Sequence, residues 1–166
     1  MKKLIAGTAA VSVALLAFGG TAGAAARPTE TLTITIDVAH PNGPSPVTAT
    51  GAFNGSGTDV RTSHVKRGID RARDVFTFDG GTVTVRDIGR RTSKLDATTC
   101  TRSFTERGFW QIRRGTGTFA HAKGQGHYKA TGTVNGVQGT SGCDFTAPTG
   151  TITVTATGHV NGKITA

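Results

Sequence analysis

The stretch from Gly108 to Tyr128, GFWQIRRGTGTFAHAKGQGHY, decides how the chain folds. Its first part alternates as a β-strand does, which places Trp110 and Ile112 on one face of the sheet. The run Gly-Thr-Gly at 115–117 indicates a turn, since glycine tolerates turn conformations. A second alternating segment follows and carries Tyr128. The stretch therefore predicts two strands and a glycine turn that bend and close a sheet.

Alternation continues along the rest of the chain after residue 30. Segments with a period of two are typical of half-buried strands, and they span 31–39, 47–57, 74–79, 82–88, 98–106, 108–116, 124–134, 137–145 and 149–160. Gly80-Gly81 and Asn135-Gly136 are typical of two-residue hairpin turns. Residues 58–73 show little periodicity, and we expect an exposed loop there with a short edge strand at most. The pattern predicts an all-β fold, a single antiparallel β-barrel of about eight strands.

The segment Trp-x-Ile-x-x-Gly-Thr-Gly-x-Phe-x-x-Ala-x-Gly-x-Gly-x-Tyr, at 110–128, resembles the signature of the allene oxide cyclase and dirigent-like barrel superfamily. The resemblance is strongest to the small secreted bacterial members. It implies an eight-stranded barrel, allene oxide cyclase-like or calycin-like, with an apolar interior and an architectural Gly-Thr-Gly turn. It also implies that a cofactor-independent cyclase or isomerase activity should be considered, although it assigns no catalytic residue to a position of this chain.

The start of the chain has the three parts of a secretory signal peptide. Lys2 and Lys3 precede an apolar run over 4–18, and small residues follow. A membrane-spanning helix is the alternative, but the run is shorter than the roughly 20 residues that a span needs. We therefore expect a cleavable signal peptide over 1–26, a β-barrel domain over 27–166 and a secreted mature protein without a transmembrane segment.

Positive charge is concentrated in the middle of the chain. Residues 61–129 hold 15 basic and 6 acidic side chains. Such a surface can attract an anionic cell envelope, although an ordinary solvated barrel exterior is the simpler interpretation. The segment has few aromatic residues between its cations and no nucleic-acid-binding motif, so we expect no specific nucleic-acid partner.

Cys100 and Cys143 are the two cysteines of the chain. In an exported protein an even pair favours a disulfide over a metal or catalytic site. Closing a loop of this length would stabilise the fold by about 4 kcal/mol on the chain-entropy model. Two free thiols are the alternative.

The side chains that alternation turns inward include aromatic residues that could line a ligand pocket. Tyr128 would supply a polar hydroxyl there. Arg102 is the one cation among the candidate pocket residues. The candidate pocket residues are Phe76, Phe104, Trp110, Ile112, Tyr128 and Arg102.

The same inward faces carry two acidic side chains. Asp74 and Asp87 lie directly opposite each other if Gly80-Gly81 forms the turn. Either they form a close carboxyl pair or, as we expect, both sit in water at the barrel mouth; an ion pair between Arg102 and Asp87 is a third arrangement. Histidine spacing fits no metal motif, and the sequence predicts no metal and no cofactor.

The sequence leaves three hypotheses for function. The barrel binds a small apolar or aromatic ligand inside; or it is a structural or envelope-associated protein with a filled barrel; or it is a cofactor-independent cyclase or isomerase. An empty apolar cavity would favour the first hypothesis, and a filled interior with a basic surface would favour the second. Polar groups deep inside the barrel would favour the third.

Overall fold

Nine antiparallel strands make up the fold in a computed structural model that describes residues 29–41 and 43–161. They are β1 (Thr29–Asp37), β2 (Ser45–Thr50), β3 (Gly55–Lys66), β4 (Ile69–Phe78), β5 (Gly81–Asp96), β6 (Thr101–Gly115), β7 (Lys123–Gly139), β8 (Gly142–Thr149) and β9 (Thr151–Asn161). A short 3-10 turn, η1 (Gly117–Phe119), separates β6 from β7. The fold class is therefore all-β, as predicted.

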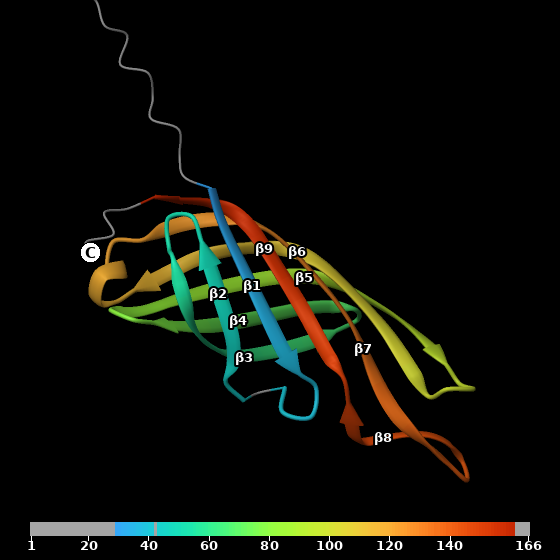
Figure 1. The fold of residues 1–166 in the computed structure, drawn as a ribbon. Helices are drawn as coiled ribbons and strands as arrows, with labels where there is room; N and C mark the ends of the chain where they lie inside the picture. The colour runs from blue at the N-terminus through green and yellow to red at the C-terminus, as the bar shows by residue number, and fades with distance from the viewer. Residues whose placement is uncertain (1–28, 42, 162–166) are drawn as a thin grey trace, which may run out of the picture.

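Eight of these strands close into a barrel (Figure 1). Neighbours in the sequence pair from β1 to β7, β9 then pairs with both β7 and β1, and every pairing is antiparallel. β8 is the ninth strand, and it pairs with the end of β7 outside the barrel. The expected single barrel of about eight strands is confirmed. The predicted signal peptide over 1–26 lies outside the described residues, and the division at 27 stays a prediction.

Alternation explains why β1 and β9 pair. On β1 the side chains of Leu32, Ile34 and Ile36 are buried, and the intervening threonines face outward. β9 repeats the pattern, with Val154 opposite Ile34. Apolar side chains inside and β-branched threonines outside suit a pleated sheet with one wet face.

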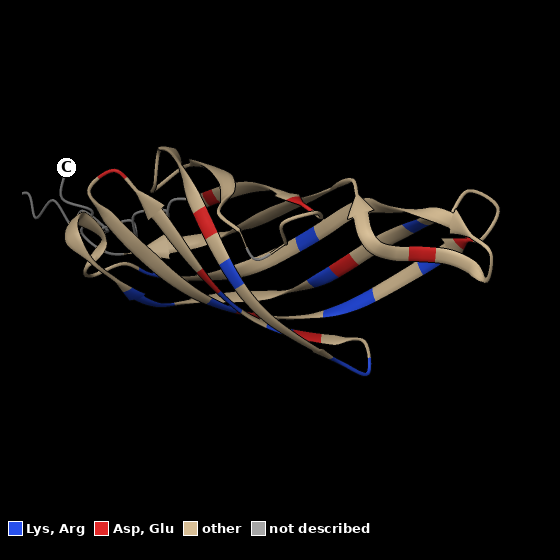
Figure 2. Cartoon of the chain, turned by 90° about the horizontal axis from the view of Figure 1, so that it is seen from below, with Lys and Arg blue, Asp and Glu red and all other residues tan. Residues whose placement is uncertain are grey.

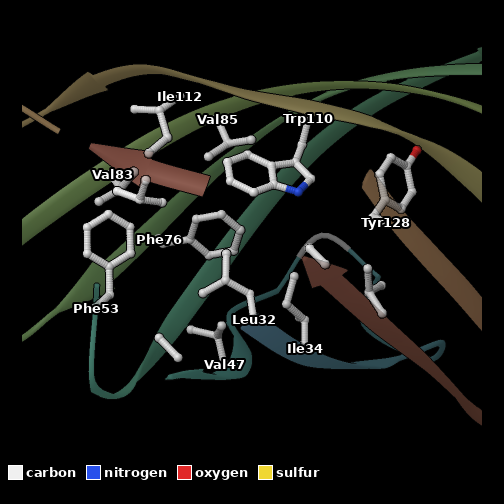
Figure 3. Packing of buried hydrophobic residues seen from close by; sticks show 14 of the residues in the cluster. Leu32, Ile34, Val47, Phe53, Phe76, Val83, Val85, Trp110, Ile112 and Tyr128 are labelled. Carbon is white, nitrogen blue, oxygen red and sulfur yellow. The ribbon is translucent and has the colours of Figure 1, made fainter. Parts of the chain in front are cut away.

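Side chains from strands all round the barrel meet inside it (Figure 3). Trp110 lies close to Phe76 and Val85 at the centre of this core, and its indole Nε1–H donates to the carbonyls of His127 and Thr157, both at 3.2 Å. An eight-stranded barrel is just wide enough for side chains to fill. The inward positions predicted for Trp110 and Phe76 are confirmed.

The predicted Gly-Thr-Gly turn closes one end of the barrel. Gly117 has a φ of +57°, a conformation that favours glycine. The turn swings Phe119 back over the core, where its ring packs edge-on against Phe53 with centroids 5.1 Å apart. Gly124 is needed for space instead, because a Cβ there would lie 2.8 Å from the backbone carbonyl oxygen of His159. Both glycines are therefore architectural.

The hairpin of β4 and β5 differs from the predicted register. Asp79 and Gly80 form the turn, and Gly81 already pairs with Phe78. Gly80 is the second central residue of the turn, with a φ of +86°, and Gly81, with a φ of +156°, already starts β5. Asp74 consequently pairs with Val85 and not with Asp87.

Two further predictions of irregular structure are wrong. Residues 58–73 form most of β3 and the start of β4. The sequence did not reveal these strands, because charged side chains occupy their inward positions and no apolar alternation marks them. Asn135-Gly136 is not a hairpin turn: β7 runs on to Gly139, and the register shifts between Asn135 and Val137. Gly136 instead donates its N–H to the Cys100 carbonyl at 2.9 Å.

The predicted disulfide between Cys100 and Cys143 is confirmed, with a Cα–Cα distance of 5.3 Å. It ties the turn between β5 and β6 to β8, and so fastens two extensions that project beyond the barrel in Figure 1. Cys143 pairs with Gln138 and not, as the expected hairpin required, with Tyr128.

We expect Cys143→Ser to lower the free energy of unfolding by about 2–5 kcal/mol, because the loop that the bond closes becomes free in the unfolded chain. Urea unfolding of oxidised wild type and variant measures the difference. Reduced wild type is the control and should match the variant; equal stability of all three forms would show that the bond contributes nothing.

Candidate functional site

A cluster of charged side chains lies inside the barrel, on the inward positions of five neighbouring strands. We call it the inner cluster, and its members are Asp59, Arg61, Asp70, Asp74, Asp87, Arg91, Glu106 and Tyr128. All five carboxyl side chains are buried. Burying a charge is costly unless it is paired and hydrogen-bonded, so the cluster must hold its own counter-charges.

Arg61 lies at the centre of the inner cluster. Its Nη1 donates to both carboxyl oxygens of Asp74, at 2.9 and 3.0 Å, and both its terminal nitrogens reach Asp87, at 3.1 and 3.2 Å. Nη2 also lies 3.4 Å from Asp70 Oδ2. The planar guanidinium suits such multiple contacts with carboxylates. Burial alone would lower its pKa, but the surrounding carboxylates outweigh burial and raise it.

Arg91 holds the other side of the inner cluster. Its Nη2 donates to Asp70 Oδ2 at 2.7 Å and its Nε to Glu106 Oε2 at 2.9 Å. The guanidinium lies 4.6 Å from the ring centroid of Phe104, a cation–π contact. The Arg91 side chain is 35 % exposed, whereas its two carboxyl partners are fully buried. Arg91 is therefore more exposed than Arg61, the other guanidinium of the cluster.

Tyr128 joins the cluster through its hydroxyl, which points away from the apolar core in Figure 3. It donates to Glu106 Oε1 and lies 3.2 Å from Asp87 Oδ1. Burial and the bond to Glu106 raise the pKa of Tyr128 above its ordinary range. Gly89 and Gly108 make room for it, because a Cβ at either position would collide with the Tyr128 side chain.

Carboxyl groups outnumber guanidinium groups in the inner cluster, five to two. Asp59 Oδ1 and Asp70 Oδ1 are buried without a hydrogen-bond partner. Burial raises the pKa of Asp59 to about 7, and burial together with a hydrogen bond to Asp87 raises the pKa of Asp74 to about 9. The cluster therefore retains protons near neutral pH. Within the described residues no group of three or more side chains is placed to hold a metal ion.

The outward positions of the same strands carry the opposite charge. We call the basic face that part of the outer surface of β4, β5, β6 and β7 which carries the exposed cations Arg71, Arg73, Arg86, Arg90, Arg107, Arg113 and Lys129. Figure 2 shows blue and red positions on the strands of the barrel, and the acidic residues of β4, β5 and β6 are buried except Asp96, at the far end of β5.

The cations of the basic face stand in rows across the strands. Arg73 pairs directly with Arg86. Two residues further along each strand lies a row of mainly apolar and aromatic side chains, Ile88, Phe109 and His127. Two residues beyond that row, Arg90 pairs with Arg107, and Arg107 with Lys129. Like charges directly opposite each other destabilise a sheet, so these rows have an electrostatic cost that an anionic partner would remove.

The surface is hollowed at this place. Three concave regions lie along the outer wall of the barrel, and Phe109 forms part of the wall of each. Arg90, Arg107 and Lys129 line one of them, and Arg71, Arg73, Arg86 and Arg113 line another. Of the residues that we predicted for a pocket, Tyr128 is in the wall of one and Ile112 in that of another, whereas Phe76, Phe104 and Trp110 are in none.

The structure separates the residues that we predicted for an internal pocket. Phe76, Phe104, Trp110, Ile112 and Tyr128 are buried inside the barrel. Arg102 is not inside: it is exposed, and its guanidinium lies 4.6 Å from the centroid of the Phe145 ring. Tyr128 is in contact with the inner cluster.

The acidic residues that we expected at a wet barrel mouth are buried in the barrel. Asp74 and Asp87 are 4 % and 8 % exposed, and Arg61 is the cation that pairs with them, not Arg102. Arg61 was not among the predicted site residues, because it lies in 58–73, for which we expected a loop. The one available signal was the alternation of Asp59 and Arg61 with outward residues.

Comparison of the chain with models of known protein families, with curated proteins and with solved structures finds no match. The resemblance to the allene oxide cyclase and dirigent-like superfamily therefore stays a prediction. No helix in the described part of the chain is long and apolar enough to span a membrane.

We expect stability to fall as the pH rises. The folded pKa values of Asp59 and Asp74, about 7 and about 9, exceed the ordinary value of 3.8, so the folded protein binds more protons than the unfolded chain between these limits. Their contribution is complete below about pH 4 and is lost as pH rises through 7 and 9. In thermal unfolding the Tm should fall between pH 5 and pH 9.5, and this fall should be smaller in Asp74→Asn than in the wild type. A Tm that rises with pH would contradict this.

We expect Arg61→Met to lower the free energy of unfolding by about 3–5 kcal/mol at pH 7, because it leaves buried carboxylates without their counter-charge. The loss should be smaller at pH 5, where the carboxyl groups take up protons. Urea denaturation measures it, and Arg73→Met is the matched control on an exposed arginine opposite Arg86. Equal effects of the two substitutions would show that Arg61 is not the counter-charge on which the buried carboxylates depend.

Proposed function

We propose that the protein is an exported, filled β-barrel that binds anionic polymers of the cell envelope through its basic face. The observation that carries this proposal is the charge arrangement of β4 to β7, where acidic side chains turn inward and like-charged side chains stand opposite one another outside. A positively charged concave surface raises the local concentration of an anionic partner. Binding would also relieve the repulsion within the rows.

The other two hypotheses have less support. A ligand inside the barrel would have to displace Trp110, whose ring is buried in the core and whose indole N–H is bonded to two carbonyls. An enzyme would need its acid–base groups within reach of a substrate, and the carboxyl groups of the inner cluster are buried and paired with Arg61 and Arg91. Polar groups inside the barrel, which we took as favouring an enzyme, are here engaged with one another.

We expect the protein to bind dextran sulfate but not neutral dextran, and the affinity to fall steeply with added salt, since cations that contact a polyanion release its counterions. Isothermal titration calorimetry at several salt concentrations measures this. The double variant Arg90→Gln/Arg107→Gln should weaken binding and reduce the salt dependence.

Lys94→Gln is the matched control, because Lys94 is an exposed cation on β5 in the hairpin beyond the basic face. It should bind as wild type does. Binding that is independent of salt, or equal losses in the control and the double variant, would remove the basic face as the site.

We expect apolar and aromatic small molecules to leave the fluorescence of Trp110 unchanged, because its ring packs against the core. A titration with a panel of such compounds tests this. A saturable shift in emission, absent from Trp110→Phe, would favour the internal ligand and contradict the filled barrel.

A further inference from the structure

The basic face carries more than charge, since an aromatic ring and neutral hydrogen-bonding groups lie among its cations. We propose that its ligand is an acidic polysaccharide, with a sugar ring packed on Phe109 and its acid groups paired with the flanking arginines. This inference rests on the proposed function and names the chemistry of the polymer that the same site takes.

Phe109 offers an exposed ring on the basic face. Its side chain is exposed on the outer surface of β6 and contributes to the walls of all three concave regions. His127 of β7 packs against it edge-on, with ring centroids 5.8 Å apart and an interplanar angle of 72°. Ile88 pairs with it on β5. An exposed ring held by its neighbours on both sides is a platform for the apolar face of another ring.

Neutral hydrogen-bonding side chains lie beside this ring. Gln111, Gln125, Thr157 and His159 line the same concave region as Phe109, and all are exposed. Amide, hydroxyl and imidazole groups both donate and accept hydrogen bonds. Such a set matches sugar hydroxyls, which also do both, whereas a surface evolved only for charge would not need it.

Cations of the basic face flank the row that contains Phe109. Arg86 and Arg90 lie two residues to either side of Ile88 on β5, and Gln111 and Arg107 lie two residues to either side of Phe109 on β6. Two residues of a strand span about 7 Å. Acid groups on either side of a ring that rests on Phe109 would therefore meet cations, and guanidinium groups bind carboxylate or sulfate in a planar, bidentate way.

Single-stranded nucleic acid and membranes fit the face less well. Successive bases stack on successive aromatic side chains, and of the large hydrophobic side chains exposed in the described part of the chain Phe109 is the one aromatic. A membrane surface is flat and takes up apolar side chains that project toward it. Here the apolar pair, Ile88 and Phe109, lies in the walls of hollows.

The experiment compares four polyanions at one salt concentration and equal charge: polygalacturonate, inorganic polyphosphate, oligothymidylate and vesicles that contain phosphatidylglycerol. Calorimetry should give the highest affinity for polygalacturonate, since polyphosphate has charge but no ring. Phe109→Leu keeps an apolar side chain and removes the ring. It should weaken polygalacturonate binding about three- to tenfold, the value of an aromatic contact, and leave polyphosphate binding unchanged.

Val60→Ala is the control, because Val60 is exposed on β3 and lies in none of the three concave walls. It should not alter either affinity, and thermal unfolding of each variant shows that it folds. Preference for oligothymidylate or for vesicles would overturn the proposal in favour of those partners. Equal affinity for all four, with no effect of Phe109→Leu, would overturn it and leave the proposed function standing. No binding to any polyanion would overturn both.

Discussion

The guanidinium of Arg61 is the group on which the rest of this barrel depends. It lies among the carboxyl groups of Asp74, Asp87 and Asp70, which come from two other strands and are nearly closed to solvent. Side chains of opposite charge can share a low-dielectric interior only when their hydrogen bonds are largely satisfied. The cluster fixes how β3, β4 and β5 are aligned, since a slip by one residue would turn these charges outward.

The same alternation that buries the acidic side chains exposes the basic ones. On β5 the inward Asp87 lies between the outward Arg86 and Ile88, and on β6 the inward Glu106 precedes the outward Arg107. The barrel wall is thus negative inside and positive outside over these strands. Attraction across the thickness of one sheet offsets part of the repulsion within each row, and the rows remain available to an anionic partner.

Simple alternation was enough to predict the fold class and the inward side chains of Trp110 and Tyr128, because apolar side chains mark these strands; the disulfide followed from the single pair of cysteines in a chain expected to be exported. Alternation failed where polar side chains occupy the inside. The spacing of Asp59 and Arg61 has the period of a strand, but charged residues are ordinarily outside, so the segment was taken for a loop. Alternation places both Arg61 and Arg102 on the inward side of their strands. Arg102 nevertheless lies where β6 extends beyond the barrel, and the sequence does not show where the barrel ends.

The most direct test of the account is an NMR titration of the side-chain carboxyl carbons. The buried, coupled carboxyl groups of Asp59 and Asp74 should titrate with apparent midpoints of about 7 and about 9. Asp96, which is exposed and accepts hydrogen bonds from the N–H groups of Thr98 and Thr99, should titrate below the ordinary value of 3.8. Midpoints near 4 for all three carboxyl groups would contradict a buried cluster that retains protons, and with it the sorting of charge between the two faces of the barrel wall.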